Sequence, residues 1–303
     1  MRHKNRIKTS RLWFVAMMLC FWNSFSGCTK QAVMECPQEV ELHVQAVNAE
    51  NEDITDEGVV KGVSFYLFDK DKLFLKRVDV PVNKPLRLYF PDEEFLHVVS
   101  WGNLTENRAE LPQLAKGTPM HQAVVHLLSA PTFRHKSSEA HALALTPDDL
   151  FYSYDEISLK SGSQTRHTVR MHRTVSAMTV TLRNLQSYAN RYDENYSLVV
   201  RETYNTIDFL SRLIGEKVGY MPPSSFNKKK ELIAPLFNML PSHTGDGIAI
   251  DVYHDRQLIT TIKKDSQGNP LRTQTGKVLN VLIDFKLQVN VEVSIPPWGT
   301  IHI

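Results

Sequence analysis

Residues 279–295 read Leu-Asn-Val-Leu-Ile-Asp-Phe-Lys-Leu-Gln-Val-Asn-Val-Glu-Val-Ser-Ile. Every odd-numbered position in this stretch is apolar, and Leu282 is the only apolar residue at an even-numbered position. Successive side chains of a strand point to opposite faces, whereas a helix would spread these apolar residues around its axis. At about 3.3 Å per residue the stretch exceeds an ordinary strand of about 5–6 residues, so it predicts either one very long strand or two strands joined by a bend.

Similar strand patterns recur through the rest of the chain, and helix patterns are scarce. Short runs rich in β-branched and aromatic residues lie at 40–44, 63–68, 95–101, 196–200 and 248–253. Such residues fit a pleated, half-buried surface, and polar turn residues separate the runs. The sequence therefore predicts an all-β protein built from short strands.

The longest extended stretch outside the C-terminal segment, residues 165–182, indicates where the chain divides. Its alternation of apolar and polar residues changes phase between Arg173 and Met178. Because a one-residue shift moves every side chain to the other face of a sheet, two strands joined by a kink or a domain crossover fit better than one strand. We therefore predict two tandem β-sandwich domains, at 38–172 and 173–303.

The first 27 residues have the layout of a secretory signal peptide. A basic, acid-free segment precedes an apolar run at 12–22, and small residues precede Cys28. The run is shorter than the roughly 20 residues that span a bilayer, so we expect a cleaved leader at 1–27 rather than a permanent membrane helix. Small residues directly before a cysteine resemble the bacterial lipobox, in which the thiol is acylated and becomes the new N-terminus. The sequence predicts a lipid on Cys28 and a tether at 28–37, and the alternative is an ordinary signal peptide in which Cys28 has no role.

Removing the leader changes the charge of the chain. The whole sequence has 35 Lys and Arg against 33 Asp and Glu, and five of the bases but none of the acids precede Cys28. The mature chain then has 30 bases against 33 acids, a formal charge of −3, so its charge does not indicate nucleic-acid binding. After loss of Cys20 and acylation of Cys28, Cys36 is the only free thiol, which excludes an intramolecular disulfide. We expect Cys36 to be an incidental or buried thiol.

No motif in the sequence indicates catalysis or a bound cofactor. Glycine-rich phosphate loops, HExxH, GxSxG and CxxC pairs are absent. The acidic cluster at 52–57 lacks the regular spacing of a calcium loop and is expected to be a solvated loop. Two histidine pairs, His121 with His126 and His135 with His141, lie in a loop-rich region without the cysteines or clustered acids of a zinc site. We therefore predict no enzyme activity, no metal and no cofactor.

Four short segments in the first half of the sequence occur in a recognisable order. They are Val-Ser-Phe-Tyr-Leu-Phe-Asp at 63–69, Phe-Leu-His-Val-Val-Ser-Trp-Gly-Asn at 95–103, Asp-Leu-Phe-Tyr at 149–152 and Thr-Val-Arg-Met-His-Arg-Thr-Val-Ser at 168–176. Together with the lipobox, this order resembles the FimB/Mfa-type fimbrial anchor lipoproteins of Bacteroidales over most of residues 36–183. The second half is similar mainly in its final alternating strands and in Pro296-Pro297-Trp298.

The resemblance implies two transthyretin-like, Greek-key β-sandwich domains and a non-enzymatic role. It implies an outer-membrane lipid anchor at Cys28 and a position at the base of a fimbria, where the protein terminates or limits polymerisation. The implied partners are the fimbrial shaft subunit and accessory fimbrial subunits. In such fimbriae subunits join by strand addition, in which main-chain hydrogen bonds supply affinity and alternating side chains fill pockets.

The resemblance also draws attention to the two ends of the mature chain. Shaft subunits of related fimbriae are matured by an Arg-specific protease that removes an early strand and opens an acceptor groove. Here no arginine lies between Cys28 and Arg77. We therefore expect the strand at 40–44 to stay attached and to link the lipid to the first domain. Residues 287–295 are either a donor strand or part of the core, and one-sided alternation favours the core.

A surface adhesin or glycan-binding module is the alternative function. Trp101, Tyr152 and Trp298 are the candidate residues for stacking on sugar rings. Each lies within or beside a predicted strand, so we expect them to occupy core positions instead. Exposure of the rings distinguishes the two functions.

Overall fold

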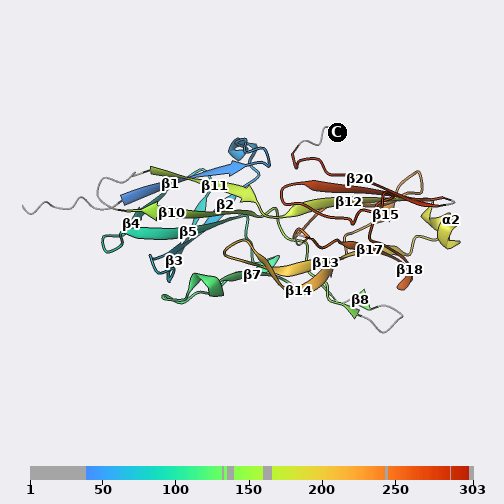
Figure 1. Ribbon diagram of the computed structural model, residues 1–303, viewed down its shortest axis with the longest axis horizontal. Helices are drawn as coiled ribbons and strands as arrows, with labels where there is room; N and C mark the ends of the chain where they lie inside the picture. The colour runs from blue at the N-terminus through green and yellow to red at the C-terminus, as the bar shows by residue number, and fades with distance from the viewer. Residues whose placement is uncertain are drawn as a thin grey trace, which may run out of the picture. The chain divides into compact units, whose positions relative to one another are not determined.

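The computed structural model describes residues 39–131, 133–134, 140–159, 166–242, 245–286 and 288–299, and these residues form an almost entirely β protein (Figure 1). The helical elements among them are short: η1 (Thr55–Glu57), η2 (Met120–Gln122) and α2 (Leu185–Ala189). None of the helices in these ranges is long and apolar enough to cross a membrane. The predicted all-β class is confirmed.

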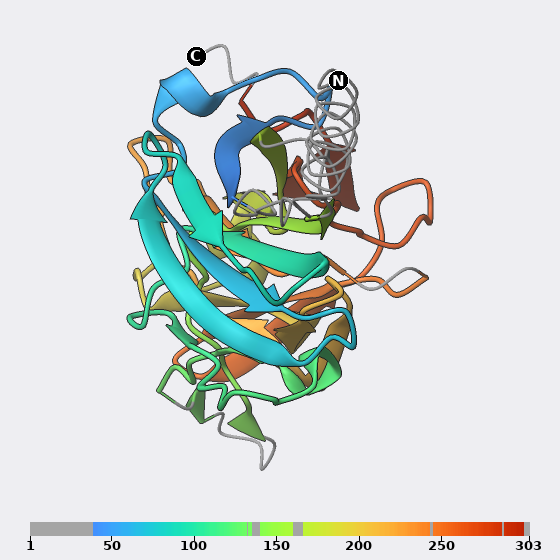
Figure 2. The same ribbon diagram turned by 90° about the vertical axis from the view of Figure 1, so that its left-hand side faces the viewer.

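The first sheet contains seven strands in the order β3-β2-β5-β10-β11-β1-β4. Strands β10 and β11 share only two residue pairs, one of which joins Phe151 to Arg173, so the sheet folds there into two layers. Buried side chains from both layers, such as Phe65 of β2 and Leu42 of β1, belong to one core cluster. The blue-to-cyan strands of this sheet face the viewer in Figure 2. The seven strands are β1 (Glu39–Val47), β2 (Gly62–Phe68), β3 (Phe74–Pro81), β4 (Leu86–Tyr89), β5 (Phe95–Gly102), β10 (Phe151–Ser158) and β11 (Arg166–Arg173).

The second and third sheets contribute buried side chains to another core cluster, for example Leu182 of β12 and Val200 of β13. The second sheet has the order β15-β16-β12-β19-β20, and the third has the order β18-β17-β13-β7-β6, with β14 also paired to β13. A separate two-stranded sheet joins β8 (Phe133–Arg134) to β9 (Ala140–His141). The strands of the second sheet are β12 (Ser176–Arg183), β15 (Ser225–Phe226), β16 (Leu232–Met239), β19 (Val278–Phe285) and β20 (Val289–Ser294). Those of the third are β6 (Ala109–Glu110), β7 (Val124–Leu127), β13 (Tyr196–Asp208), β14 (Leu213–Tyr220), β17 (Ala249–His254) and β18 (Gln257–Ile262).

The alternating stretch at 279–295 forms two strands, because β19 and β20 pair as an antiparallel hairpin. In β19 the odd-numbered residues are buried, as the alternation predicts. In β20 only Val291 is buried, whereas Val289 and Val293 are 38% and 37% exposed. The core prediction is therefore wrong for these two valines, because β20 is the outermost strand of its sheet. Leu287 lies outside the described residues.

The phase change between Arg173 and Met178 marks a crossover between sheets. β11 ends at Arg173 in the first sheet, and β12 begins at Ser176 in the second. One part of the first half crosses the same division, since Val125 of β7 pairs with Ile207 of β13 in the third sheet. The division into domains at 38–172 and 173–303, and their transthyretin-like topology, stay predictions.

The β13–β14 turn joins the core of the second half to the first sheet. The ring centroid of Phe209 lies 4.8 Å from that of Tyr66 and 6.1 Å from that of Trp101. The hydroxyl of Tyr152 donates a hydrogen bond of 2.8 Å to the carbonyl oxygen of Phe209. Burial raises the pKa of Tyr66 to about 12. The two halves of the chain therefore share buried aromatic packing at Phe209.

We expect Phe209→Ala to lower the free energy of unfolding by about 3–5 kcal/mol, because it leaves a cavity between aromatic rings. The matched control is Leu210→Ala at the next residue, which is 41% exposed and should change stability by less than about 0.5 kcal/mol. Urea unfolding followed by tyrosine and tryptophan fluorescence measures both values. Equal effects of the two substitutions would contradict this packing.

Candidate functional site: the sheet edges

The predicted N-terminal strand is an interior strand of the first sheet. β1 pairs in parallel with β11 from Glu41 to Val47 and pairs antiparallel with β4 from Glu39 to Leu42. Val40 and Leu42 are 1% and 0% exposed. Removing β1 would uncover core side chains and leave unpaired edges on both neighbouring strands. The predicted lipidation residue Cys28 and the thiol of Cys36 lie outside the described residues.

The first arginine after Cys28 is held inside a strand. Arg77 lies in the middle of β3, where it pairs with Tyr66 of β2. Its Nε donates to the carboxylate of Asp79 at 2.9 Å, and its guanidinium lies 5.4 Å from the centroid of the Tyr66 ring. Proteolysis concentrates in exposed loop tips rather than in paired strands. Arg77 is thus a poor cleavage site in the folded protein.

Both outer strands of the first sheet carry protections against further strand pairing. The N–H of Phe74 in β3 donates to the carbonyl of Thr118, and its carbonyl accepts from Gly117, each at 2.8 Å. Charged residues follow along the same strand. β4 has only four residues, and Pro91 comes soon after it. A long added strand would therefore meet a covered residue and charged side chains on β3, and only a short edge on β4.

A single serine closes the middle of the β20 edge. The N–H of Ser266 donates to the carbonyl of Val291 at 3.0 Å, and the Oγ of Ser266 accepts from the Val291 N–H at 2.6 Å. Asp265 holds the turn, because its carboxylate accepts from the backbone N–H groups of Gln267 and Asn269. Ser266 thus occupies the position that a neighbouring strand would take.

The other protected edges are short or interrupted. β6 and β15 have two residues each, and Pro235 in β16 has no N–H to donate. β14 is partly covered, because Gly219 accepts from the N–H of Ala144 at 3.0 Å and donates to the carbonyl of Ala142 at 2.9 Å.

The outer edge of β18 has no covering contact from the described residues and no proline or charged residue along its length, and its one interruption is an irregularity near the hairpin turn. The strand reads Gln-Leu-Ile-Thr-Thr-Ile, with no charged residue and no proline. Within the described part of the chain no strand pairs with this edge. The register to β17 shifts between Val252 and Tyr253, which leaves Ile259 as an extra residue near the hairpin turn. Leu258 is 47% exposed.

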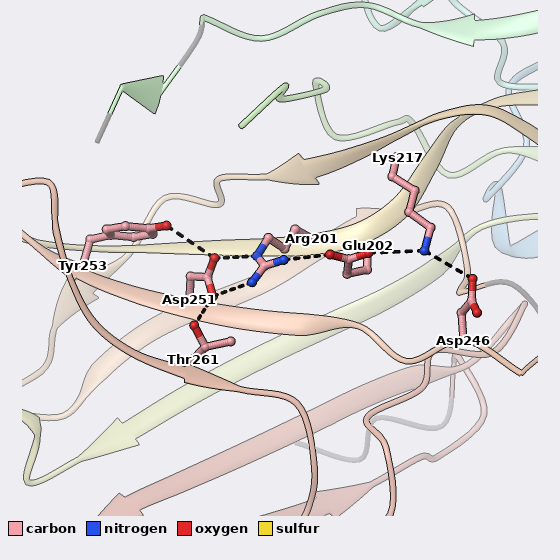
Figure 3. A network of polar contacts seen from close by, with 7 residues as sticks. All are labelled: Arg201, Glu202, Lys217, Asp246, Asp251, Tyr253 and Thr261. Carbon is pink, nitrogen blue, oxygen red and sulfur yellow. Dashed lines mark hydrogen bonds and ion pairs between the residues drawn. The ribbon is translucent and has the colours of Figure 1, made fainter. Parts of the chain in front are cut away.

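A buried carboxylate on β17 links β18 to β13 within the same sheet (Figure 3). Asp251 of β17 is 1% exposed and accepts from Arg201 Nε and from Thr261 Oγ1 of β18, each at 2.6 Å. The hydroxyl of Tyr253 donates to the same carboxylate at 3.3 Å. Burial opposes the charge of Arg201, but the hydrogen bond and charge of Asp251 outweigh it and raise the arginine pKa. The β17–β18 hairpin is therefore held by a charged, hydrogen-bonded centre.

The charged centre continues along the same face of the sheet. Arg201 Nη1 donates to Glu202 at 2.7 Å, and the ammonium of Lys217 lies 3.3 Å from Glu202 and 3.5 Å from Asp246. Glu202 has φ of +75° at an irregularity in the pairing of β13 with β14. A bulge in this conformation redirects a side chain, and here the carboxylate lies between the two cations (Figure 3).

The three candidate stacking aromatics are packed against the protein. Trp101 is fully buried, which confirms the core position expected for it and excludes its alternative role in stacking on sugar rings. Tyr152 is half-buried, with its ring centroid 5.0 Å from that of Trp101. The half-buried Trp298 ring lies 4.7 Å from the guanidinium carbon of Arg173. These rings form packing contacts rather than an open platform.

Arg173 connects the end of β11 to the C-terminal segment. Its Nε lies 3.0 Å from the carboxylate of Asp149, and its guanidinium carbon lies 5.1 Å from the centroid of the Phe151 ring and 4.7 Å from that of the Trp298 ring. Burial raises the pKa of Asp149, and the charge of Arg173 opposes that shift. Arg173 therefore contacts Asp149 through an ion pair and Trp298 through its ring, where the chain passes between sheets.

No group of three or more His, Cys, Asp or Glu side chains that could hold a metal ion occurs in the described ranges. His126 contacts the hydroxyl of Thr206 at 2.8 Å. His135 and the side chain of His141 lie outside the described residues. In the acidic cluster, Asp53 accepts from Thr55 and Gln45 and so orders its own loop.

Sequence reasoning missed Ser266, the Arg201–Asp251 pair and the unprotected β18 edge. One signal was available for Asp251, because a carboxylate within the apolar run at 248–253 needs a buried partner. The partner itself, Arg201, is 50 residues away and becomes adjacent only when β13 pairs with β17.

Solved structures of other β proteins share this fold. A putative adhesin from Bacteroides ovatus has a TM-score of 0.63 at 16% identity, covering 87% of this chain and 96% of that one. The fimbrial anchor protein Mfa2 from Porphyromonas gingivalis has a TM-score of 0.62 at 16% identity, covering 87% of this chain and 98% of that one.

The chain belongs to the family of Fimbrillin-A associated anchor proteins Mfa1 and Mfa2, which matches residues 33–303. The major fimbrium anchoring subunit FimB of Porphyromonas gingivalis is 27% identical over 300 residues, covering 94% of each chain. FimB of the W83 strain is 28% identical and covers 94% of this chain and 95% of the relative. The resemblance seen in the sequence is confirmed, and the family implies a fimbrial anchor role at the cell surface.

We expect Arg201→Met to lower the free energy of unfolding by about 3 kcal/mol, because it leaves the Asp251 carboxylate buried without its cation. The matched control is Lys217→Met, whose side chain is 47% exposed and should cost less than about 1 kcal/mol. Urea unfolding measures both values. A loss for Lys217→Met as large as that for Arg201→Met would contradict the central role of Asp251.

Proposed function

We propose that this protein is a non-enzymatic outer-membrane lipoprotein that fixes the base of a fimbria to the cell and limits its growth. The lipid would be on Cys28, and residues 28–37 would connect it to β1. The interior position of β1 carries this proposal, because the strand nearest the lipid is paired on both edges. Force on the tether would then load hydrogen bonds to β11 and β4 together.

The same position of β1 supports a role in ending the fimbria. A shaft subunit that has lost an early strand offers a vacant place in its sheet to the strand of another subunit. Here that place lies between β11 and β4 and holds the protein's own β1. No further subunit would insert there, so the polymer would stop at this protein. The shaft subunit would instead be held by strand addition at another sheet edge.

We expect Cys28→Ser to leave thermal unfolding of the purified protein unchanged and to reduce cell-retained fimbriae by at least about tenfold, because the acyl chains supply the membrane affinity. Cys36→Ser is the matched control, since it removes a thiol and leaves the lipobox intact. Fimbriae are measured in the cell pellet and in the medium after gentle shearing. Unchanged retention with Cys28→Ser would contradict the lipid anchor.

We expect the mature protein to begin at acylated Cys28 and to retain β1, because no arginine lies between Cys28 and Arg77. Mass spectrometry of the N-terminal peptide from outer-membrane fractions measures this. A mature N-terminus beyond Val47 would contradict the retained strand.

A further inference from the structure

The open edge of β18 is a surface that the anchor role alone does not explain. Exposed rows of backbone N–H and C=O groups template pairing with other chains, and proteins close most of them. The protein closes the β20 edge with Ser266 and covers the β3 edge at Phe74. On β18, six residues without charge or proline remain open.

We propose that the outer edge of β18 binds an extended strand donated by a fimbrial shaft subunit. Because this assignment rests on the proposed anchoring function, it names the place where that function binds its partner. The added strand would pair beside Thr260 to Ile262, where the register to β17 is regular again, and would continue past Ile259 to Leu258. Its backbone would pair with β18, and one face of it would place an apolar side chain near Leu258.

The exposed charges around β18 are mostly positive and favour an acidic partner over a second copy of this chain. Arg256 precedes the strand and Lys263 and Lys264 follow it, against Asp255 before the strand, and all four residues are exposed; the next acid, Asp265, is half-buried in its turn. Antiparallel pairing of two β18 edges about their centre would place Arg256 of one copy opposite Lys263 of the other, and Asp255 opposite Lys264. The opposite charges of the second pair offset the like charges of the first, but both copies keep an excess of exposed bases and so repel each other. A donated strand with acidic residues beside its apolar positions fits this edge better.

The β17–β18 hairpin presents its edge in a fixed position. Asp255 and Arg256 both have positive φ, +47° and +64°, as in the two-residue turns that match strand twist. Thr261 is hydrogen-bonded to Asp251, which Arg201 neutralises. A strand docking here would therefore meet an ordered edge, and less ordering free energy is lost on binding than with a flexible one.

The test compares one substitution on the open edge strand with the same substitution on the closed one. Leu258→Lys on β18 and Val293→Lys on β20 change residues that are 47% and 37% exposed. Immobilised full-length protein is incubated with fimbriae sheared from the same cells, and captured shaft subunit is quantified. We expect capture to fall by at least about tenfold for Leu258→Lys, since lysine is a natural protection of edge strands, and by less than about twofold for Val293→Lys. Thermal unfolding checks that both variants are folded.

A cross-linking experiment identifies the partner and does not depend on the lysine variant folding. In a Cys36→Ser background, Leu258→Cys is linked with a thiol-to-amine reagent in the presence of sheared fimbriae, and Val293→Cys is the control. We expect Leu258→Cys alone to form a product whose linked peptide comes from a terminal strand of the shaft subunit. A product containing two copies of this chain, or equal yields at both positions, would overturn the proposal.

The results of the capture experiment distinguish failure of the β18 assignment from failure of the proposed anchor role. Capture that is unchanged by Leu258→Lys would overturn the β18 assignment and leave fimbrial anchoring standing. Absence of capture by the unsubstituted protein would contradict both.

Discussion

Pairing of backbone N–H and C=O groups is the constraint on which this structure depends. In an almost entirely β chain, each outermost strand leaves one row of these groups without a strand partner. β1 meets the constraint by lying between β11 and β4, and β20 meets it through Ser266. An edge that no such contact closes is therefore informative, because another chain can satisfy its backbone groups without rearranging the fold.

The contacts within the described residues also give a continuous route for mechanical load. The strand nearest the predicted lipid pairs with β11, which ends at Arg173, and Arg173 holds Trp298 of the C-terminal segment. A second connection runs through Phe209, which packs on Tyr66 and Trp101 of the first sheet. Phe209 immediately follows β13, the strand to which the β17–β18 hairpin pairs. Tension between the tether and β18 would thus cross paired strands and buried aromatic packing rather than a flexible linker.

Local periodicity predicted much of the fold, and it failed where burial depends on distant strands. The alternation in β19 and the crossover after Arg173 were visible, because side-chain direction in a strand follows from the sequence position alone. Val289 and Val293 continue the same alternation but lie on an outermost strand that the core covers only at Val291. The pairing of β7 with β13 could not be predicted from local periodicity either, since it joins residues about 80 positions apart in the sequence.

The sequence by itself determined the all-β class and the lack of an arginine between Cys28 and Arg77, because each is a property of neighbouring residues. Tertiary structure alone decided which edges are closed. Ser266 reaches Val291 only after the second and third sheets have formed, and Arg201 meets Asp251 only once β13 and β17 pair. Strand propensity is local, but whether a strand lies inside a sheet or at its edge depends on long-range pairing.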